Sequence, residues 1–253
     1  MDGTSPARLT GSKAPGSQGD SPPTIRLDNV HLELASAAGP VNILRGIDLV
    51  VEAGEVAAIV GPSGSGKSSL MMLVGGLERP TGGRVAVADR DLTRLGEDAL
   101  ALFRRSHVGI VFQNFHLVPT MTALENVAIP LEFAGAPDAF DRAADRLRAV
   151  GLGHRLSHYP GQLSGGEQQR TALARAFAAD PDVILADEPT GNLDGETGRQ
   201  VIELMFDLSR KRGATLLLIT HDPALAARCD RIIRLVDGLI VDDGRTAART
   251  ASA

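Results

Sequence analysis

The chain has 253 residues, 43% of them hydrophobic, and a formal net charge of -5. This acidic balance provides no general basic surface for non-specific attraction to nucleic acid, so no nucleic-acid partner is expected. A single cysteine, Cys229, excludes an intrachain disulfide, and its apolar neighbourhood predicts a packed and unreactive thiol.

Both ends of the chain are predicted to be tails. Residues 1–23 are rich in Gly, Pro and Ser and have almost no large apolar side chains, which predicts a disordered segment. Residues 244–253 are small and polar and are predicted to be flexible. No stretch reaches the roughly 18 apolar residues of a membrane span, and the N-terminus lacks the apolar core of a secretion signal. We therefore expect a cytoplasmic chain with one folded unit over residues 24–243.

The predicted elements change character along the chain. Short strand patterns come first, at residues 25–34, 47–51, 56–60, 84–88 and 108–112. Helical periodicity then dominates residues 123–133, 139–150 and 167–179, which predicts a helical lobe over about 114–180. Apolar runs return at 183–186, 215–220 and 231–236, with an amphipathic stretch at 197–212. This alternation of strand and helix predicts an α/β fold with a parallel sheet.

A glycine-rich loop follows the apolar strand 56–60 and precedes a helical segment at 70–77. It consists of Gly61, Pro62, Ser63, Gly64, Ser65, Gly66, Lys67, Ser68 and Ser69. The glycines let the backbone turn so that N–H groups point at phosphate oxygens, and the helix N-terminus adds partial positive charge. Lys67 is predicted to reach the β- and γ-phosphates of a nucleotide, and the Ser68 hydroxyl to ligate Mg²⁺.

Two adjacent carboxylates, Asp187 and Glu188, end the buried run at 183–186. Open α/β sheets bind ligands at the carboxyl ends of their strands. We expect Asp187 to hold Mg²⁺ and Glu188 to polarise the water that attacks the γ-phosphate. The alternative is an ordinary acidic turn after a strand.

A second glycine motif, Leu163-Ser164-Gly165-Gly166-Glu167, precedes a strong helix. Ser164 and Glu167 have the spacing of a capping box, so one interpretation is only a helix start. The adjacent glycines Gly165 and Gly166 expose N–H groups at the positive end of a helix, which favours a second anion site.

In this order the motifs resemble those of the nucleotide-binding subunit of an ATP-binding cassette (ABC) transporter, from about residue 24 to 243. The resemblance also uses Gln113 in Val111-Phe112-Gln113, the run Asn192-Leu193-Asp194, and His221 in Thr220-His221-Asp222. It implies an ABC ATPase of the P-loop NTPase class, with a RecA-like core, an antiparallel β subdomain and a helical signature subdomain.

The resemblance further implies a head-to-tail homodimer that encloses two ATP molecules with Mg²⁺. Each ATP would be bound by the phosphate loop of one subunit and by Ser164, Gly165, Gly166 and Glu167 of the other. By the same resemblance Gln113 senses Mg²⁺ and the attacking water, His221 contacts the γ-phosphate, and Asp194 lies at the dimer seam. Taken alone, a histidine or glutamine after an apolar strand is as well explained by capping or packing.

Within that family the chain resembles the lipoprotein-release and macrolide-export branch, on residues 186–194, 75–77 and 117–127. This likeness implies a peripheral ATPase on the cytoplasmic face of the inner membrane, driving an integral permease with a large extracytoplasmic domain. One alternative is an ATPase that switches on an envelope enzyme without moving a substrate. Another is a soluble ABC ATPase that acts on nucleic acid or ribosomes, although this chain has neither a second cassette nor a coiled-coil insertion.

Two features of the chain bear on its binding surfaces. Many family members stack an aromatic ring on adenine near the end of the first strand, but residues 32–38 contain none and Leu34 offers only apolar contact. We therefore expect weaker adenine discrimination and some use of GTP. Phe112, Phe115 and residues 117–127 either line a groove for a permease helix or pack between lobes. The basic residues Arg104, Arg105 and His107 are expected to form a solvated face.

Overall fold

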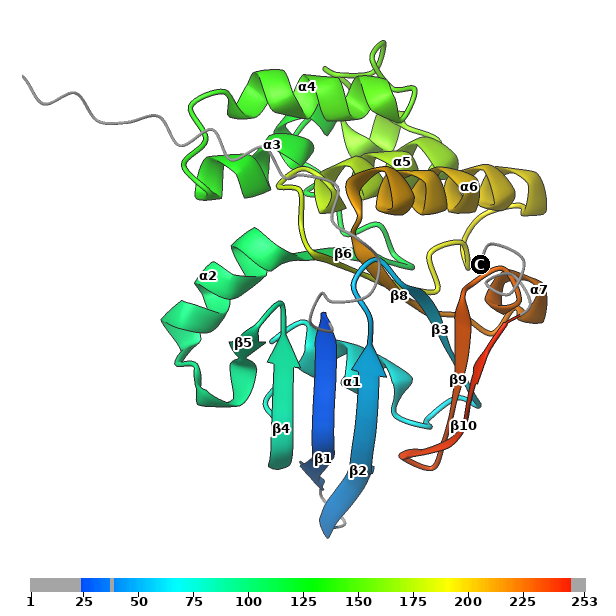
Figure 1. The fold of residues 1–253 in the computed structure, drawn as a ribbon. Helices are drawn as coiled ribbons and strands as arrows, with labels where there is room; N and C mark the ends of the chain where they lie inside the picture. The colour runs from blue at the N-terminus through cyan, green and yellow to red at the C-terminus, as the bar shows by residue number, and fades with distance from the viewer. Residues whose placement is uncertain (1–23, 37–38, 247–253) are drawn as a thin grey trace, which may run out of the picture.

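A computed structural model describes residues 24–36 and 39–246, which form two sheets and a layer of helices (Figure 1). The tail predictions for residues 1–23 and 247–253 lie outside the described residues. Gly244 and Arg245, predicted as part of the C-terminal tail, instead end strand β10. They pair there with Ile232 and Arg231 of the neighbouring strand.

The strands are β1 (Ile25–Ser36), β2 (Gly39–Val51), β3 (Val56–Val60), β4 (Gly82–Val87), β5 (Arg90–Asp91), β6 (Val108–Phe112), β7 (Val183–Asp187), β8 (Thr215–Ile219), β9 (Arg231–Val236) and β10 (Leu239–Arg245). The α-helices are α1 (Lys67–Val74), α2 (Glu97–His107), α3 (Ala123–Phe133), α4 (Ala139–Ala149), α5 (Gly165–Ala176), α6 (Gly195–Arg212) and α7 (Pro223–Ala226), with 3-10 turns at Leu92–Arg94 and Pro160–Gln162. No helix in residues 24–36 and 39–246 is long and apolar enough to cross a membrane.

The larger sheet has the order β10-β9-β3-β8-β7-β6 and is parallel except for the edge strand β10. The smaller sheet is antiparallel, with the order β2-β1-β4-β5. Helices α3 to α6 gather on one side of the larger sheet, and the antiparallel sheet lies on the other (Figure 1). This arrangement confirms the predicted fold class, with a parallel core, an antiparallel β subdomain and a helical layer.

The six-stranded sheet separates two apolar cores, and its strands contribute to both. Along β8, Leu216 and Leu218 pack in the core shared with the helices, whereas Leu217 and Ile219 pack in the core shared with the antiparallel sheet and α1. A strand covered on both faces needs apolar side chains at every position. This explains why the runs at 183–186 and 215–220 show no alternation in the sequence.

Several elements differ from the sequence predictions, and β5, α7 and β10 were not predicted at all. Strand β2 begins at Gly39, eight residues before the predicted start, because it pairs with β1 in a long hairpin in which Leu34 lies opposite Val41. The register between β1 and β2 is irregular, which disturbs the alternation of apolar and polar residues from which a strand is predicted. Helix α2 was not predicted, and it carries the basic residues that had been assigned to a solvated face.

Cys229 is fully buried in the core between the large sheet and the helices, as the sequence predicted. Burial raises the pKa of its thiol to about 12, so the thiol remains protonated and unreactive at neutral pH.

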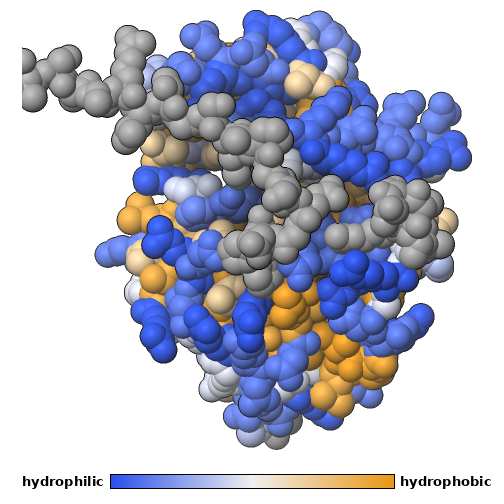
Figure 2. All heavy atoms as spheres, viewed as in Figure 1, coloured by the Kyte–Doolittle hydropathy of each residue, from blue (hydrophilic) through white to orange (hydrophobic). Residues whose placement is uncertain are grey.

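The surface over β2 and β10 is apolar, and Figure 2 shows apolar side chains gathered there while the helical layer is mostly hydrophilic. Val41 on β2 and Leu239 and Val241 on β10 are among the exposed large hydrophobic residues. This patch lies beside the end of β1 that carries Leu34, because Leu34 and Val41 are cross-strand partners.

We expect Gly109→Ala to destabilise the contact between β6 and α5. A Cβ atom at this position would overlap the carbonyl oxygen of Ala176 and lie 2.7 Å from Ile184 Cδ1. Overpacking of this kind lowers the free energy of unfolding by about 1–3 kcal/mol. Urea denaturation followed by circular dichroism measures the change. Gly161→Ala, where a Cβ meets nothing within 4 Å, is the control, and equal unfolding midpoints for the two variants would contradict the prediction.

Candidate nucleotide-binding and hydrolysis site

The glycine-rich loop runs from the end of β3 into α1, and its geometry requires glycine at two positions. Gly61 and Gly66 have φ angles of +153° and +100°. A Cβ at Gly61 would overlap the carbonyl oxygen of Leu235, and one at Gly66 would lie 2.8 Å from Leu44 Cδ2. Gly66 also precedes α1 without a side-chain cap, so the first N–H groups of the helix remain available to an anion.

Lys67 and Ser68 begin α1 and face different partners. Lys67 Nζ donates to the carbonyl oxygens of Gly61 (3.0 Å) and Pro62 (2.7 Å), so its ammonium group lies across the loop. Ser68 Oγ donates to Asp187 Oδ2 at 2.9 Å. The structure thus brings together a hydroxyl and a carboxylate that are 119 residues apart in sequence.

These oxygen donors fit Mg²⁺, a hard cation that is bound through one or two carboxylates together with substrate phosphates. Within the described residues no cluster of three or more His, Cys, Asp or Glu side chains could hold a metal by itself. The Ser68 and Asp187 pair is therefore suited to a cation that arrives with a nucleotide.

Three parallel strands place the other predicted residues at one edge of the sheet. Phe112 at the end of β6 is paired with Asp187 at the end of β7, which is paired with Ile219 at the end of β8. The residues that follow each strand, Gln113, Glu188 and the segment to His221, therefore emerge side by side.

Glu188 and His221 form the central pair at this edge. Glu188 Oε2 contacts His221 Nδ1, and the Glu188 side chain is 22% exposed while that of His221 is 76% exposed. Glu188 has a φ of +47°, in a region that bulky residues seldom occupy, and its N–H donates to the carbonyl of Ile219 at 3.0 Å. The hydrogen bond to β8 thus holds the backbone of Glu188 in an uncommon conformation, and its carboxylate lies next to the His221 imidazole.

Gln113 is oriented by the segment that follows Glu188. Its Nε2 donates to Asn192 Oδ1 at 3.4 Å, and Asn192 Nδ2 donates to the Gln113 carbonyl (3.1 Å) and to Asn114 Oδ1 (2.8 Å). A Cβ at Gly191 would lie only 2.6 Å from Gln113 Nε2. Sequence reasoning noted Asn192 only as part of a motif and missed its contact with Gln113.

The second glycine motif forms the helix start that the sequence predicted. Ser164 Oγ accepts from the Glu167 N–H at 3.3 Å, and Glu167 Oε2 accepts from the Ser164 N–H at 2.9 Å. The hydrogen bond that Glu167 accepts from the Ser164 N–H holds the pKa of Glu167 below its usual range. A hydrogen bond from the Arg155 guanidinium acts in the same direction. The capping box is therefore present with an ionised carboxylate, while binding of an anion by Gly165 and Gly166 remains a prediction.

The second glycine motif packs against the start of α6 and the loop before it. A Cβ at Gly166 would overlap Thr197 Cγ2, and one at Gly165 would lie 3.4 Å from Leu193 Cδ2. Asp194 caps α6 by accepting from the N–H groups of Glu196 and Thr197, and the Thr197 bond is the largest cause that lowers the pKa of Asp194.

The structure therefore groups the predicted residues into two sets. Lys67, Ser68, Asp187, Glu188 and His221 lie along the phosphate loop and the strand ends. Residues 164–167 and Asp194 lie at the starts of α5 and α6. Among the described residues, no hydrogen bond or ion pair connects 164–167 with the phosphate loop.

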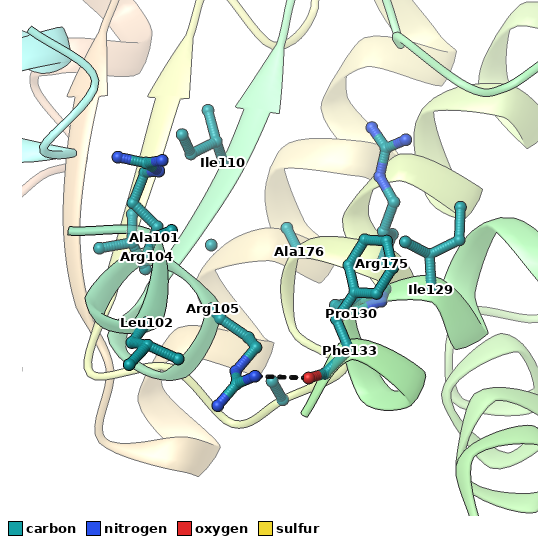
Figure 3. Close-up of a pocket in the computed structure, with 13 residues that line it drawn as sticks. Ala101, Leu102, Arg104, Arg105, Ile110, Ile129, Pro130, Phe133, Arg175 and Ala176 are labelled. Atoms are coloured by element: carbon teal, nitrogen blue, oxygen red, sulfur yellow. Dashed lines mark hydrogen bonds between the residues drawn. The ribbon is translucent and has the colours of Figure 1, made fainter. Parts of the chain in front are cut away.

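A groove of about 700 Å³ lies between α2, α3 and the end of α5 (Figure 3). Leu102, Arg104 and Arg105 line it from α2, with Phe133 opposite on α3. The guanidinium of Arg105 donates to the Phe133 carbonyl at 2.6 Å across the groove, and Phe133 is 69% exposed. The groove is thus lined mainly by apolar side chains, with basic side chains from α2 among them.

The sequence hypothesis of a groove for a permease helix named other residues than those that line this groove. Phe112, Phe115 and residues 117–127 are absent from the groove, and Ala123 and Val127 are fully buried in the helical core. The alternative, packing between lobes, is correct for these two residues. Of the basic residues expected on a solvated face, Arg105 is exposed, whereas Arg104 and His107 are half-buried, and His107 Nδ1 lies 2.7 Å from Asp182 Oδ2.

A family model described as ABC transporter matches residues 44–191. The lipoprotein-releasing system ATP-binding protein LolD of Anaeromyxobacter dehalogenans (strain 2CP-C) is 52% identical over 227 residues, covering 88% of this chain and 94% of LolD. The ABC transporter ATP-binding protein YbbA of Escherichia coli (strain K12) is 50% identical over 217 residues, covering 84% and 95%.

A longer relative and a solved structure agree with these matches. The macrolide export ATP-binding/permease protein MacB of Rhodopseudomonas palustris (strain HaA2) is 45% identical over 230 residues, which cover 90% of this chain but 35% of MacB. The dimeric post-hydrolysis structure of the ATP-binding cassette MJ0796 with ADP and Pi is 38% identical, with a TM-score of 0.81, covering 87% of this chain and 98% of that one. The chain belongs to the ABC transporter family and is one of its ATP-binding subunits, an ABC-type ATPase.

Proposed function

We propose that this subunit dimerises head to tail around two ATP molecules and drives a membrane permease of the lipoprotein-release or macrolide-export type. The observation that carries the proposal is the division of the predicted residues into two sets within one chain. Because the phosphate-loop set and the 164–167 set do not meet, two subunits are needed to enclose a nucleotide between them. The dimeric MJ0796 structure with ADP and Pi supports this arrangement.

In the proposed site the phosphate loop, residues 61–69, cradles the phosphates, and Lys67 leaves its carbonyl partners for the β- and γ-phosphate oxygens. Ser68, Asp187 and Gln113 would hold Mg²⁺, which neutralises charge on those oxygens. Glu188 accepts a proton from the attacking water. His221, in contact with Glu188, would orient that carboxylate and donate to the γ-phosphate.

The permease partner is proposed from the relatives and from the groove. LolD is named as part of a lipoprotein-releasing system, and MacB as both ATP-binding protein and permease. We therefore infer that the subunit works with a permease. The groove of Figure 3 would receive a cytoplasmic segment of that permease, which we expect to carry a large extracytoplasmic domain. The subunit would then lie on the cytoplasmic face of the inner membrane.

Glu188→Gln is expected to keep ATP binding, to lose most hydrolysis and to accumulate an ATP-bound dimer, because an amide cannot accept the proton of the attacking water. Lys67→Ala should instead weaken ATP binding itself, since a charge-assisted phosphate contact is lost. Phosphate release, nucleotide titration and size-exclusion chromatography with ATP separate these outcomes. Wild-type turnover by Glu188→Gln would remove Glu188 from the base role.

The permease is tested with tagged Glu188→Gln, extracted from membranes in mild detergent with ATP and analysed by mass spectrometry. We expect a permease with a large extracytoplasmic domain in stoichiometric amount. Adding Phe133→Glu, which places a charge on the α3 side of the groove, should remove that protein without affecting ATP binding. Phe140→Glu, at a phenylalanine that is 45% exposed on α4 outside the groove, is the control. Ribosomal proteins in place of a membrane protein would contradict the proposal.

Leu34→Tyr is expected to strengthen ATP binding by about two- to tenfold and to increase the preference for ATP over GTP. Leu34 is 41% exposed beside the apolar patch of β2 and β10, and aromatic stacking adds roughly 0.5–1.5 kcal/mol beyond area burial. Competition titrations with both nucleotides measure the change, with Leu77→Tyr as an exposed control on another surface. A strong ATP preference already present in the wild type would refute weak adenine discrimination.

A further inference from the structure

Helix α5 carries a buried side chain that contacts the backbone beside both Gln113 and Glu188. Gln169 is fully buried, and its Nε2 donates to the carbonyl oxygens of Pro189 (2.5 Å) and Phe112 (3.4 Å). Phe112 precedes Gln113 and Pro189 follows Glu188. One amide group therefore spans the two turns that present the proposed Mg²⁺ sensor and the proposed base.

The same glutamine is not explained by stability alone. Its Oε1 is buried and has no hydrogen-bond partner among the described residues. An unpaired buried oxygen is unfavourable, and each such atom in a native structure needs a reason. A methionine has a similar length and shape and carries no unpaired oxygen. What a methionine cannot do is hold two carbonyl groups at a set separation.

Arg175, six residues further along α5, contacts the loop that begins at Gln113, two and three residues after it. Its guanidinium donates to the carbonyls of Phe115 (3.0 Å) and His116 (2.7 Å). Burial lowers the pKa of this guanidinium, and within the described part of the chain no carboxylate forms an ion pair with it. The hydrogen bonds of Arg175 are thus directed to the backbone of this loop.

We propose that Gln169 and Arg175 are positioning residues for ATP hydrolysis, and that α5 sets the separation of Gln113 and Glu188 through them. The inference rests on the roles proposed above for those two residues. Helix α5 begins at residues 164–167, so the helix that would contact the nucleotide of the partner subunit also holds the hydrolytic residues of its own subunit. A shift of α5 would then move Gln113 relative to Glu188 without any change in the phosphate loop.

The test compares Gln169→Met with Thr171→Val in the purified full-length subunit. Thr171 is also fully buried on α5, but its hydroxyl bonds only within the helix, to the Glu167 carbonyl at 2.8 Å. We expect Gln169→Met to lower kcat by about ten- to a hundredfold with KM for ATP within about twofold of wild type, since small misplacements of reacting groups have effects of this size. Thr171→Val should leave both constants within about twofold, and the two variants should have similar urea midpoints.

A double variant separates positioning from general damage. In a Gln113→Ala background, Gln169→Met should lower kcat much less than it does in the wild type, because the group that it positions is already gone. Additive losses would overturn the inference, as would a Gln169→Met enzyme with the kcat of Thr171→Val. If Gln113→Ala and Glu188→Gln themselves keep wild-type turnover, the proposed roles of those residues fail instead.

Should Gln169→Met not fold, Arg175→Lys tests the same proposal. A lysine keeps the charge but cannot donate two parallel hydrogen bonds to neighbouring carbonyls. We expect kcat to fall severalfold with KM for ATP unchanged. Arg104→Lys is the matched control, because Arg104 lines the same groove but donates to the Gly76 carbonyl and not to the loop. Equal turnover of the two lysine variants would overturn the proposal.

Discussion

The register of three neighbouring parallel strands, β6, β7 and β8, is the constraint on which the site depends. Phe112, Asp187 and Ile219 are paired in one row, so the chain leaves the sheet three times at one edge. A shift of one residue in any strand would turn its last side chain to the other face of the sheet. The register is held because each strand is apolar on both faces and buries them in two separate cores.

The phosphate loop depends on the way the two sheets meet. Its Gly61 lies against the Leu235 carbonyl of the large sheet, and its Gly66 lies against Leu44 of the antiparallel sheet. The Gly238 N–H, from the turn between β9 and β10, donates to the Ser65 carbonyl at 3.1 Å. The loop is therefore packed from both sides, and this packing holds its N–H groups in position. Preorganised dipoles of this kind lower the cost of stabilising charge during the reaction.

Residues on α5 and α6 connect the helical layer with the edge of the large sheet. The capping box at Ser164 and Glu167 and the cap at Asp194 fix the starts of the two helices, and Gly166 lets the helices approach closely. Gln169 then extends from α5 to the turns after β6 and β7. The helical layer is thereby hydrogen-bonded to the backbone next to Gln113 and Glu188.

The sequence by itself determined the features that depend on local chemistry. The phosphate loop, the carboxylate pair after β7, the capping box at 164–167 and the alternation of strands and helices were all predicted, because each needs particular residue types at short spacing. Those patterns were enough to predict the fold class and to indicate the family. The start of β2 and the existence of α2 were missed, because irregular pairing and a short amphipathic helix leave weak periodic signals.

Only the tertiary structure decided which distant residues meet. The contact of Ser68 with Asp187, the placement of Gln113 by Asn192, and the span of Gln169 between two strand ends join segments from 20 to 119 residues apart. The groove between α2, α3 and α5 likewise joins segments that are distant in the sequence. A glutamine or arginine in a helix looks the same in sequence whether it faces water or a buried carbonyl, and packing of the helix on the sheet makes that difference.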